Sequence, residues 1–368
     1  MKTIRRLIYG EVLQAVAFVT LGFMALFFFF DLVEEIQSVS RHAAAGYTLI
    51  HALAYVAMIM PSHLYELMPI AVLIGTIFVM ARFAQSSEYT ILRTSGLGPW
   101  RALKALLLLG LAFVMLTFLI GDYVSPVADL TAQLLKSRYT GRITLGQTGA
   151  WLKETQTYGQ YAVNVKELAP DGNLRSVRIF EFDNHGMLMS MMQAKSAQFS
   201  EDDTWILRQV QRTEFPAPDA PSARVDRTEL DVLHWPNKIS TEMVSTSLLK
   251  PERMRTIDLF QYIRHLKDNA QTAQRYEIEF WKKVFYPLSC LVMVVLALPF
   301  AYLHFRSGSI ASYVFWGVMA GISFFLLNNV FGYIGNLQNW QPWLTAALPG
   351  MIYSLLSLTA FAWLVFRR

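Results

Sequence analysis

The sequence predicts a membrane α-helical bundle of six transmembrane helices, with an all-β domain inserted between the third helix and the fourth. Apolar residues make up 54% of the chain and gather in runs of about 20, the length that crosses the hydrocarbon core of a bilayer. Between residue 121 and about residue 274 these runs give way to short alternating segments separated by turn residues. Soluble domains seldom reach such an apolar content.

The first third of the chain predicts three spans. The first run is too long for a cleaved signal peptide, and acidic residues separate it from the next small residues. In the second apolar stretch Pro61 predicts a break, so we expect residues 50–60 to lie along the membrane interface before the chain crosses back. The three predicted spans are Val12–Phe30, Leu64–Phe83 and Ala102–Ile120.

The insert reads as an antiparallel β sandwich or barrel, because turn signals recur every 8–12 residues or so. Thr256 is then expected to cap an amphipathic helix that leads the chain back to the membrane. The apolar face of that helix consists of Leu259, Tyr262, Ile263 and Leu266. The predicted strands are Gly159–Leu168, Leu174–Asp183, Gly186–Phe199, Thr204–Phe215 and Val225–Trp235.

Three more spans are predicted after the insert. The first of them contains Pro287 and Pro299, which a helix inside a bundle tolerates because neighbours satisfy the freed carbonyl groups. We therefore expect three parts: residues 1–122 with three spans, residues 123–274 with the β domain and its return helix, and residues 275–368 with three spans. The last spans are Val284–Leu303, Tyr313–Ile334 and Leu344–Phe366.

Lysine and arginine residues gather in one set of loops, which predicts that both termini are cytoplasmic and that the β domain lies outside. The opposite short connections hold Arg41 against Asp31, Glu34 and Glu35. The cytoplasmic set consists of Lys2, Arg5, Arg6, Arg82, Arg93, Arg101, Lys104, Arg306, Arg367 and Arg368.

A polar stretch at residues 85–100 interrupts the apolar sequence on the predicted cytoplasmic side. Ser86 or Ser87 can N-cap a helix there, Glu88 suits the positive end of its dipole, and Gly96 ends it. A helix of about two turns is too short to be stable alone in water. We therefore expect it to dock on a cytoplasmic partner.

The sequence contains no phosphate-binding loop, no zinc-protease motif and no G-x-S-x-G motif, so we expect no catalytic residues and no enzyme activity in this chain. The histidines are scattered and predict no metal site. The basic residues lie beside spans and not in one patch, which argues against nucleic acid. The single cysteine, Cys290, allows no intrachain disulfide.

Two groups of residues are candidates for lipid contact. Lys136 and Arg138, just outside the third span, are able to hold headgroup phosphates, although their spacing alone favours an ordinary solvated helix face. Phe23, Phe27 and Phe30 recur at helical spacing in the first span. They read either as lipid-facing or core packing residues or as an aromatic wall for acyl chains.

The sequence resembles the LptF/LptG permease family, the membrane subunits of the lipopolysaccharide export ABC transporter of Gram-negative bacteria, over essentially its whole length. The region of the first span and the Trp151 region are more similar to the LptG branch than to the LptF branch. The motifs that carry the resemblance are RFAQSSE (82–88) with RTSG (93–96), GDYVSP (121–126), and RYEIEFWKK running to PLS (275–289).

The resemblance implies an inner-membrane subunit with a periplasmic β-jellyroll-like domain. Such a subunit pairs with an LptF-type paralogue, and a cytoplasmic LptB-type ATPase dimer binds the ATP and magnesium, so this chain needs no cofactor of its own. An LptC-type single-span protein and a periplasmic bridge complete the complex. Lipopolysaccharide is extracted from the membrane and passed to that bridge.

The resemblance also implies roles for particular residues. Ser87, Glu88, Tyr89 and Arg93 correspond to the helix that couples to the ATPase. Lys136 corresponds to a headgroup-binding position, Arg138 lies close to it, and Arg41 is a further headgroup candidate beyond the end of the first span. The sequence departs from the family at the outer end of the first span, where Glu34 and Glu35 replace the expected basic residues.

Two other functions remain open from the sequence. One is a permease of another lipid or lipoprotein exporter, although such permeases are expected to carry their large outer domain between the first and second spans. The other is a membrane-anchored periplasmic binding or scaffold protein that needs no ATPase.

Overall fold

The computed structural model describes the chain as two compact units with several gaps. The helical unit comprises Met1–Gln37, Val56–Asp129 and Glu277–Arg368, and the β unit comprises Ser38–Tyr55 and Leu130–Tyr276. The described residues are 2–86, 91, 94, 98–140, 150–156, 159–169, 173–183, 185–200, 204–216, 224–237, 239, 244, 251–302 and 310–366.

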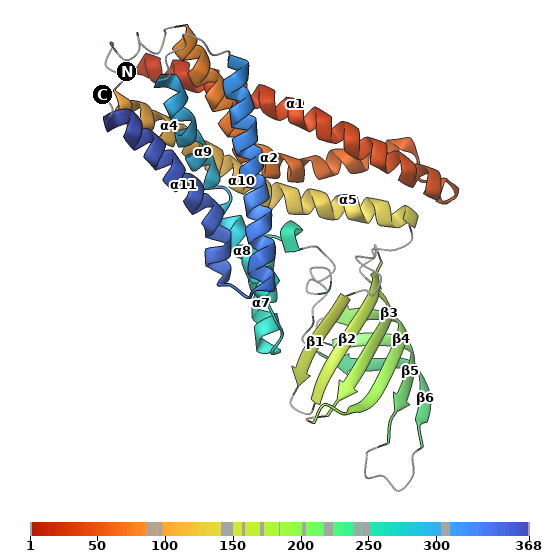
Figure 1. Cartoon of the computed structure of the whole chain (residues 1–368). Coiled ribbons are helices and arrows are strands. Elements are labelled where there is room, and N and C mark those ends of the chain that lie inside the picture. Colours follow the sequence, from red (N-terminus) through yellow and green to blue (C-terminus); the bar gives the residue numbers. More distant parts are fainter. Residues whose placement is uncertain are drawn as a thin grey trace. The chain divides into compact units, whose positions relative to one another are not determined.

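The first two helices are longer than the sequence predicts. Helix α1 covers Lys2–His42, and after a short 3₁₀ turn α2 covers Leu49–Gln85 (Figure 1). The predicted break at Pro61 is wrong, because α2 runs through both Pro61 and Pro69. Pro69 lies within the buried stretch of α2, Leu67–Ile77, so neighbouring segments surround the helix at that proline, whereas Pro61 is half-buried.

The third span is followed directly by a second helix. Helix α4 covers Pro99–Leu119, and a π-helical turn, Ile120–Val124, joins it to α5, Ser125–Thr140. Single π turns inside α-helices often mark functional positions, because they free a backbone carbonyl from the regular ladder.

The last part of the chain contains a bent span and two regular ones. Helix α8 covers Gln274–Phe285 and α9 covers Ser289–Ala297, with a bend of 46° between them around Pro287. A 3₁₀ turn with Pro299 follows α9. The chain then forms α10, Ile310–Leu337, and α11, Pro342–Phe366, which contains Pro349.

Length and composition confirm the predicted set of spans. Within the described residues five helices are long and apolar enough to cross a membrane, and the bent α8–α9 pair makes a sixth. Helix α9 packs against both α4 and α11, and α10 packs on α11 (Figure 1). Only 6% of the most apolar window of α1 and 17% of that of α10 is buried, so these two helices leave apolar surface for lipid or for another protein.

The insert forms one antiparallel sheet in which the six described strands follow one another in sequence order. The predicted strands are confirmed to within a few residues at their ends, but β1 was missed. Its seven residues alternate too weakly to stand out. The strands are β1 Ala150–Gln156, β2 Gly159–Leu168, β3 Leu174–Phe182, β4 Leu188–Ser200, β5 Thr204–Glu214 and β6 Asp226–Pro236.

One face of the sheet carries its apolar core. Val163, Val177 and Leu207, on β2, β3 and β5, are completely buried. Trp205 is buried as well, lies edge-on to Trp235 at 5.7 Å, and donates its indole N–H to the carbonyl of Ile239 at 2.8 Å. A buried indole needs such a partner, so this bond fixes the chain that follows β6 against the sheet.

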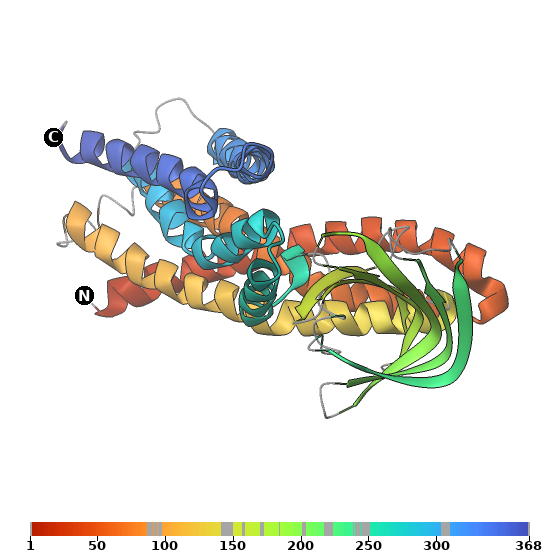
Figure 2. The ribbon, with the colours of Figure 1, turned by 90° about the horizontal axis from the view of Figure 1, so that it is seen from below.

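A row of irregular residues crosses the sheet, and Figure 2 shows the strands curving strongly. On either side of the row the register is continuous, as in the pairs Arg175↔Ser196 and Val177↔Ala194. Ser176 and Gln209 have φ values of 53° and 51°, a left-handed conformation that is uncommon outside glycine. Such bulge-like residues increase the twist and bend of strands. The row consists of Lys166, Ser176, Lys195, Gln209 and Asp231.

Helix α7, Thr256–Asp268, follows the sheet with the predicted apolar face: Leu259, Tyr262, Ile263 and Leu266 are all buried. The predicted cap is wrong by one residue. Arg255 occupies the N-cap position in extended conformation, and no side-chain hydrogen bond caps the helix. Burial of the apolar face therefore stabilises this helix without a capping side chain.

Candidate functional site

The four residues assigned to coupling, Ser87, Glu88, Tyr89 and Arg93, lie outside the described residues. The described ends that hold this segment are well defined. Helix α2 ends at Gln85, and Ser86 donates both its backbone N–H and its hydroxyl to the carbonyl of Arg82, at 2.9 and 3.0 Å. Ser86 is therefore tied to the end of α2.

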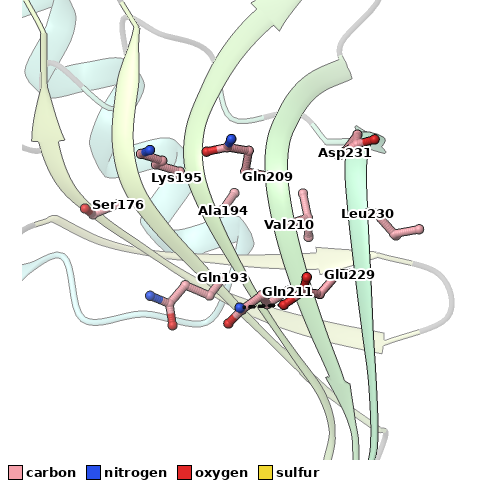
Figure 3. Close-up of a pocket in the computed structure, with 10 residues that line it drawn as sticks. All are labelled: Ser176, Gln193, Ala194, Lys195, Gln209, Val210, Gln211, Glu229, Leu230 and Asp231. Carbon is pink, nitrogen blue, oxygen red and sulfur yellow. Dashed lines mark hydrogen bonds between the residues drawn. The ribbon is translucent and has the colours of Figure 1, made fainter.

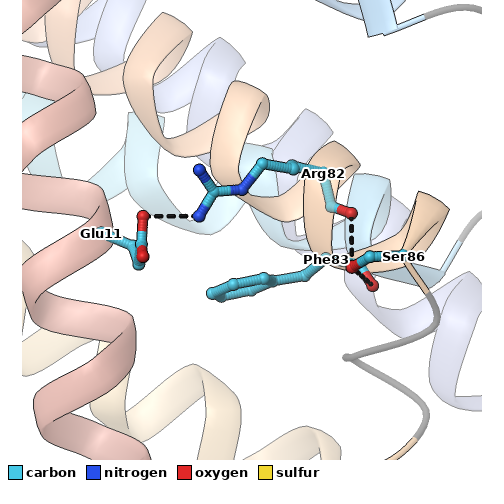
Figure 4. A network of polar contacts seen from close by, with 4 residues as sticks. All are labelled: Glu11, Arg82, Phe83 and Ser86. Carbon is cyan, nitrogen blue, oxygen red and sulfur yellow. Dashed lines mark hydrogen bonds and ion pairs between the residues drawn. The ribbon is translucent and has the colours of Figure 1, made fainter.

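An ion pair joins the end of α2 to α1. Arg82 Nη2 lies 2.5 Å from Glu11 Oε2, and the guanidinium lies over the ring of Phe83, which is fully buried (Figure 4). After the segment the chain re-enters at Gly98 and Pro99, and proline at the first helical position favours the start of α4. The chain between residues 86 and 98 thus connects the end of α2 to the start of α4.

A second group of polar contacts joins the later part of α1 to the earlier part of α2. His63 Nε2 is 2.8 Å from Asp31 Oδ2, and the imidazole stacks on Phe27 at 4.8 Å between ring centroids. Phe27 therefore packs on a histidine within its own unit. The sequence analysis assigned no partner to His63 and missed this pair, because nothing local relates positions 31 and 63.

Ser62 continues this group towards the π turn. Its hydroxyl donates to Asp129 Oδ2 at 2.7 Å, so the hydroxyl of Ser125 is the donor in the 2.5 Å contact between the two serines. Asp129 is 1% exposed. Polar groups at this depth must be paired, and the pairing fixes α2 to the start of α5.

The acidic residues near the end of α1 are not equivalent. Asp31 is paired with His63, Glu35 is buried, and Glu34 is exposed. Of the three carboxylates that the sequence places there, Glu34 alone is fully presented at the surface of the chain. The structure thus presents less acidic surface than the sequence indicates.

The candidate headgroup residue Lys136 lies in an aromatic setting within the β unit. Its Nζ is 4.6 Å from the centre of the Tyr55 ring, a cation–π distance. Nearby on the same helices, Tyr139 Oη is 2.8 Å from His51 Nε2. The backbone N–H of Thr48 donates to His51 Nδ1 at 3.2 Å, which leaves Nε2 as the protonated nitrogen that donates to the tyrosine.

The remaining candidate lipid residues are more dispersed. Arg138 is two positions from Lys136, so it faces the opposite side of α5 and is exposed. Arg41 is exposed in the last turn of α1. Phe23 and Phe27 are half-buried, whereas Phe30 is 58% exposed and lies edge-on to Phe29. The three phenylalanines share a helix face but differ in exposure.

The π turn is held by two contacts from distant helices. Lys283, 7% exposed, donates from Nζ to the carbonyl of Gly121 at 3.1 Å. A Cβ at Gly121 would collide with the ring of Tyr65. Gly121 belongs to one family-like motif and Lys283 to another, so the fold brings together two motifs that lie 162 positions apart.

A groove of about 520 Å³ lies on the β sheet along the irregular row (Figure 3). Its lining is largely polar: Lys195, Gln209 and Asp231 lie on neighbouring strands, and Gln211 donates to Glu229 at 3.0 Å. Two buried apolar residues, Ala194 and Val210, also line it. A polar groove of this kind is unsuited to acyl chains.

These features define a class before any comparison: a polytopic membrane subunit with an inserted β domain and a short interhelical segment on one side of the membrane. Residues 6–364 match the family described as lipopolysaccharide export system permease LptF/LptG. The chain therefore belongs to the LptF/LptG family, whose members are transmembrane permeases and not the ATPase.

Individual relatives agree with this assignment. The chain is 28% identical over 351 residues to the lipopolysaccharide export system permease protein LptG of Escherichia coli K12, with 94% of each chain covered. It is 25% identical over 369 residues to the LptG protein of Haemophilus influenzae, with 100% of this chain and 99% of the relative covered. The predicted family and permease function are confirmed.

Proposed function

We propose that this chain is the LptG-type half of a lipopolysaccharide exporter in the inner membrane of a Gram-negative bacterium, with both termini cytoplasmic and the β domain periplasmic. The observation that carries the proposal is the match to LptG proteins over nearly the whole of both chains. The Lys/Arg distribution supports the orientation.

The uncovered helices support a two-subunit arrangement. Helices α1 and α10 leave most of their apolar surface exposed in the single chain. A paralogous LptF-type subunit and the lipid between the two subunits would cover those surfaces. Phe30, exposed on α1, is then available to acyl chains, and Phe23 and Phe27 form the wall behind it.

We assign phosphate binding in the headgroup primarily to Lys136. Its ammonium group is held over Tyr55, which restricts the side chain before ligand binds and so lowers the entropy cost of binding. Arg138 faces away on α5 and Arg41 is fully exposed, so we assign both to the periphery of the same lipid. A single-span protein of the LptC type and a periplasmic bridge would receive the lipid.

Coupling to a cytoplasmic ATPase dimer is assigned to Ser87, Glu88, Tyr89 and Arg93. The ion pair between Glu11 and Arg82 supports this role, because it joins the end of α2 to α1 immediately before the segment. A force applied to Glu88 is then passed to α1 and α2 together. ATP and magnesium belong to the ATPase.

The experiment is substitution of Glu88 by alanine in the full complex, with Gln85→Ala as the matched exposed control. We expect Glu88→Ala to reduce ATPase co-purification and lipopolysaccharide release at least tenfold while the thermal unfolding midpoint stays unchanged. Normal ATPase recruitment and release in Glu88→Ala, or an equal loss in Gln85→Ala, would contradict the coupling role.

A further inference from the structure

A groove of about 620 Å³ runs between the N-terminal parts of α1 and α4, both in the helical unit. It lies at the end of the helical unit that holds the N-terminus. Its lining comprises Ile4, Arg5, Ile8, Tyr9, Arg101, Lys104, Ala105, Leu107, Leu108 and Leu111.

The two ends of the groove differ in chemistry. Arg5 on α1 and Arg101 and Lys104 on α4 supply cations at one end, and all three are exposed. Beyond them α4 presents leucines: Leu108 and Leu111 are 51% and 50% exposed. Lys104 and Leu111 are seven residues apart, which is about 10 Å along a helix.

The groove has a fixed floor. Tyr9 Oη donates to the backbone carbonyl of Ala105 at 2.9 Å, which joins α1 to α4, and Ile8 is buried beneath. The guanidinium of Arg5 lies 5.9 Å from the centre of the Tyr9 ring, so this cation is placed at the mouth of the groove. The apolar channel therefore exists before any ligand binds.

The electrostatics of the charged end favour an anion. Neither α1 nor α4 has an acidic residue in its first turn, and no side chain caps α4, so its positive dipole end adds to the three cations. The nearest acid along α1, Glu11, is paired with Arg82. A ligand that matches both ends carries a negative headgroup and an apolar tail of bilayer length.

We propose that this groove binds an anionic phospholipid of the leaflet next to the N-terminus, with its phosphate among Arg5, Arg101 and Lys104 and an acyl chain along Leu108 and Leu111. We propose this site as separate from the export cavity. The proposal applies whichever lipid the protein exports. Basic residues at a membrane surface recognise anionic lipids by charge, and the adjoining groove selects a chain-bearing ligand over a soluble anion.

The test is native mass spectrometry of the full-length chain in detergent, titrated with phosphatidylglycerol or with phosphatidylethanolamine of the same chains. We expect preferential retention of phosphatidylglycerol, and Arg5→Gln and Lys104→Gln should each weaken it about fivefold. Arg6→Gln is the matched control, because Arg6 is an exposed neighbour that does not line the groove. Leu108→Trp should block binding while all charges remain.

Several results would overturn the proposal. Equal retention of the two lipids would remove the anion preference, and an equal effect of Arg6→Gln would reduce it to general surface charge. Competition by soluble glycerol phosphate, or full binding in Leu108→Trp, would exclude the acyl channel. If a photoreactive phosphatidylglycerol failed to label residues 101–111 while a partner helix crosslinked there, the groove would be a protein interface.

Discussion

The helical unit and the β unit join distant parts of their chain by different means. In the helical unit polar and charged side chains make the connections, among them Lys283 with the Gly121 carbonyl and Arg82 with Glu11. In the β unit the backbone ladder joins the strands, and neutral groups fix the loops. The side-chain oxygen of Asn269 accepts a hydrogen bond from the backbone N–H of Thr155 at 2.8 Å. The indole N–H of Trp205 donates a hydrogen bond to the carbonyl of Ile239.

The difference follows from the surroundings of each unit. Helices satisfy their own backbone groups, so contacts between spans depend on side chains, and a few polar ones determine which helices are joined. A sheet joins its strands through the backbone itself, so its side chains are free to fill a core. We therefore expect the largest consequence of a local substitution at the buried helical connection around Gly121, and a much smaller one at the partly exposed pair of Arg82 with Glu11.

The largest effect is expected at the π turn. Gly121→Ala would place a methyl group against the Tyr65 ring and push the π turn away from it. We expect this change to lower the free energy of unfolding by about 1–3 kcal/mol. Gly22→Ala is the control, since a Cβ there meets nothing within 4 Å and alanine favours the helix. Thermal unfolding in detergent checks both, and an unchanged midpoint in Gly121→Ala would show that Tyr65 moves aside freely.

A smaller, pH-dependent effect is expected in the β unit. Burial lowers the pKa of His265 on α7, and the charge of Asp268 opposes this shift. Because the folded-state pKa is the lower one, the unfolded chain binds more protons, and stability falls as the pH decreases from about 6.5 through the folded value. Unfolding of wild type and of His265→Gln between pH 7.5 and 5 measures the effect. The stability of His265→Gln should depend less on pH than that of the wild type. Identical pH profiles would show that other groups cause the pH dependence.

The smallest effect on stability is expected for the ion pair of Glu11 with Arg82. Their side chains are 30% and 41% exposed, so water screens the attraction and the coupling free energy should be about 0.2–1 kcal/mol. A double-mutant cycle with Glu11→Gln and Arg82→Met isolates this value. A coupling above about 2 kcal/mol would show that the pair is shielded and would bring the helical connections closer to one another in strength.

Local patterns explain why some elements were predictable. The face of α7 and strands β2 to β6 follow from periodicities of 3.6 and 2 residues, which a short window of sequence contains. Pro61 misled the reading because its local effect is to break a helix, whereas the surrounding spans keep α2 continuous. The headgroup and acyl-chain candidates came from their position and helical spacing, the family resemblance added support for the headgroup residues, and the roles of both groups stay predictions.

The sequence by itself determined that the chain crosses a membrane with a β insert, because hydrophobic length and alternation are properties of neighbouring residues. Only the tertiary structure decided which polar residues meet: Glu11 with Arg82, 71 positions apart, Asp31 with His63, and Gly121 with Lys283. The same holds for the groove between α1 and α4. Contacts between residues far apart in sequence depend on how the helices pack, and no single stretch of the chain contains that information.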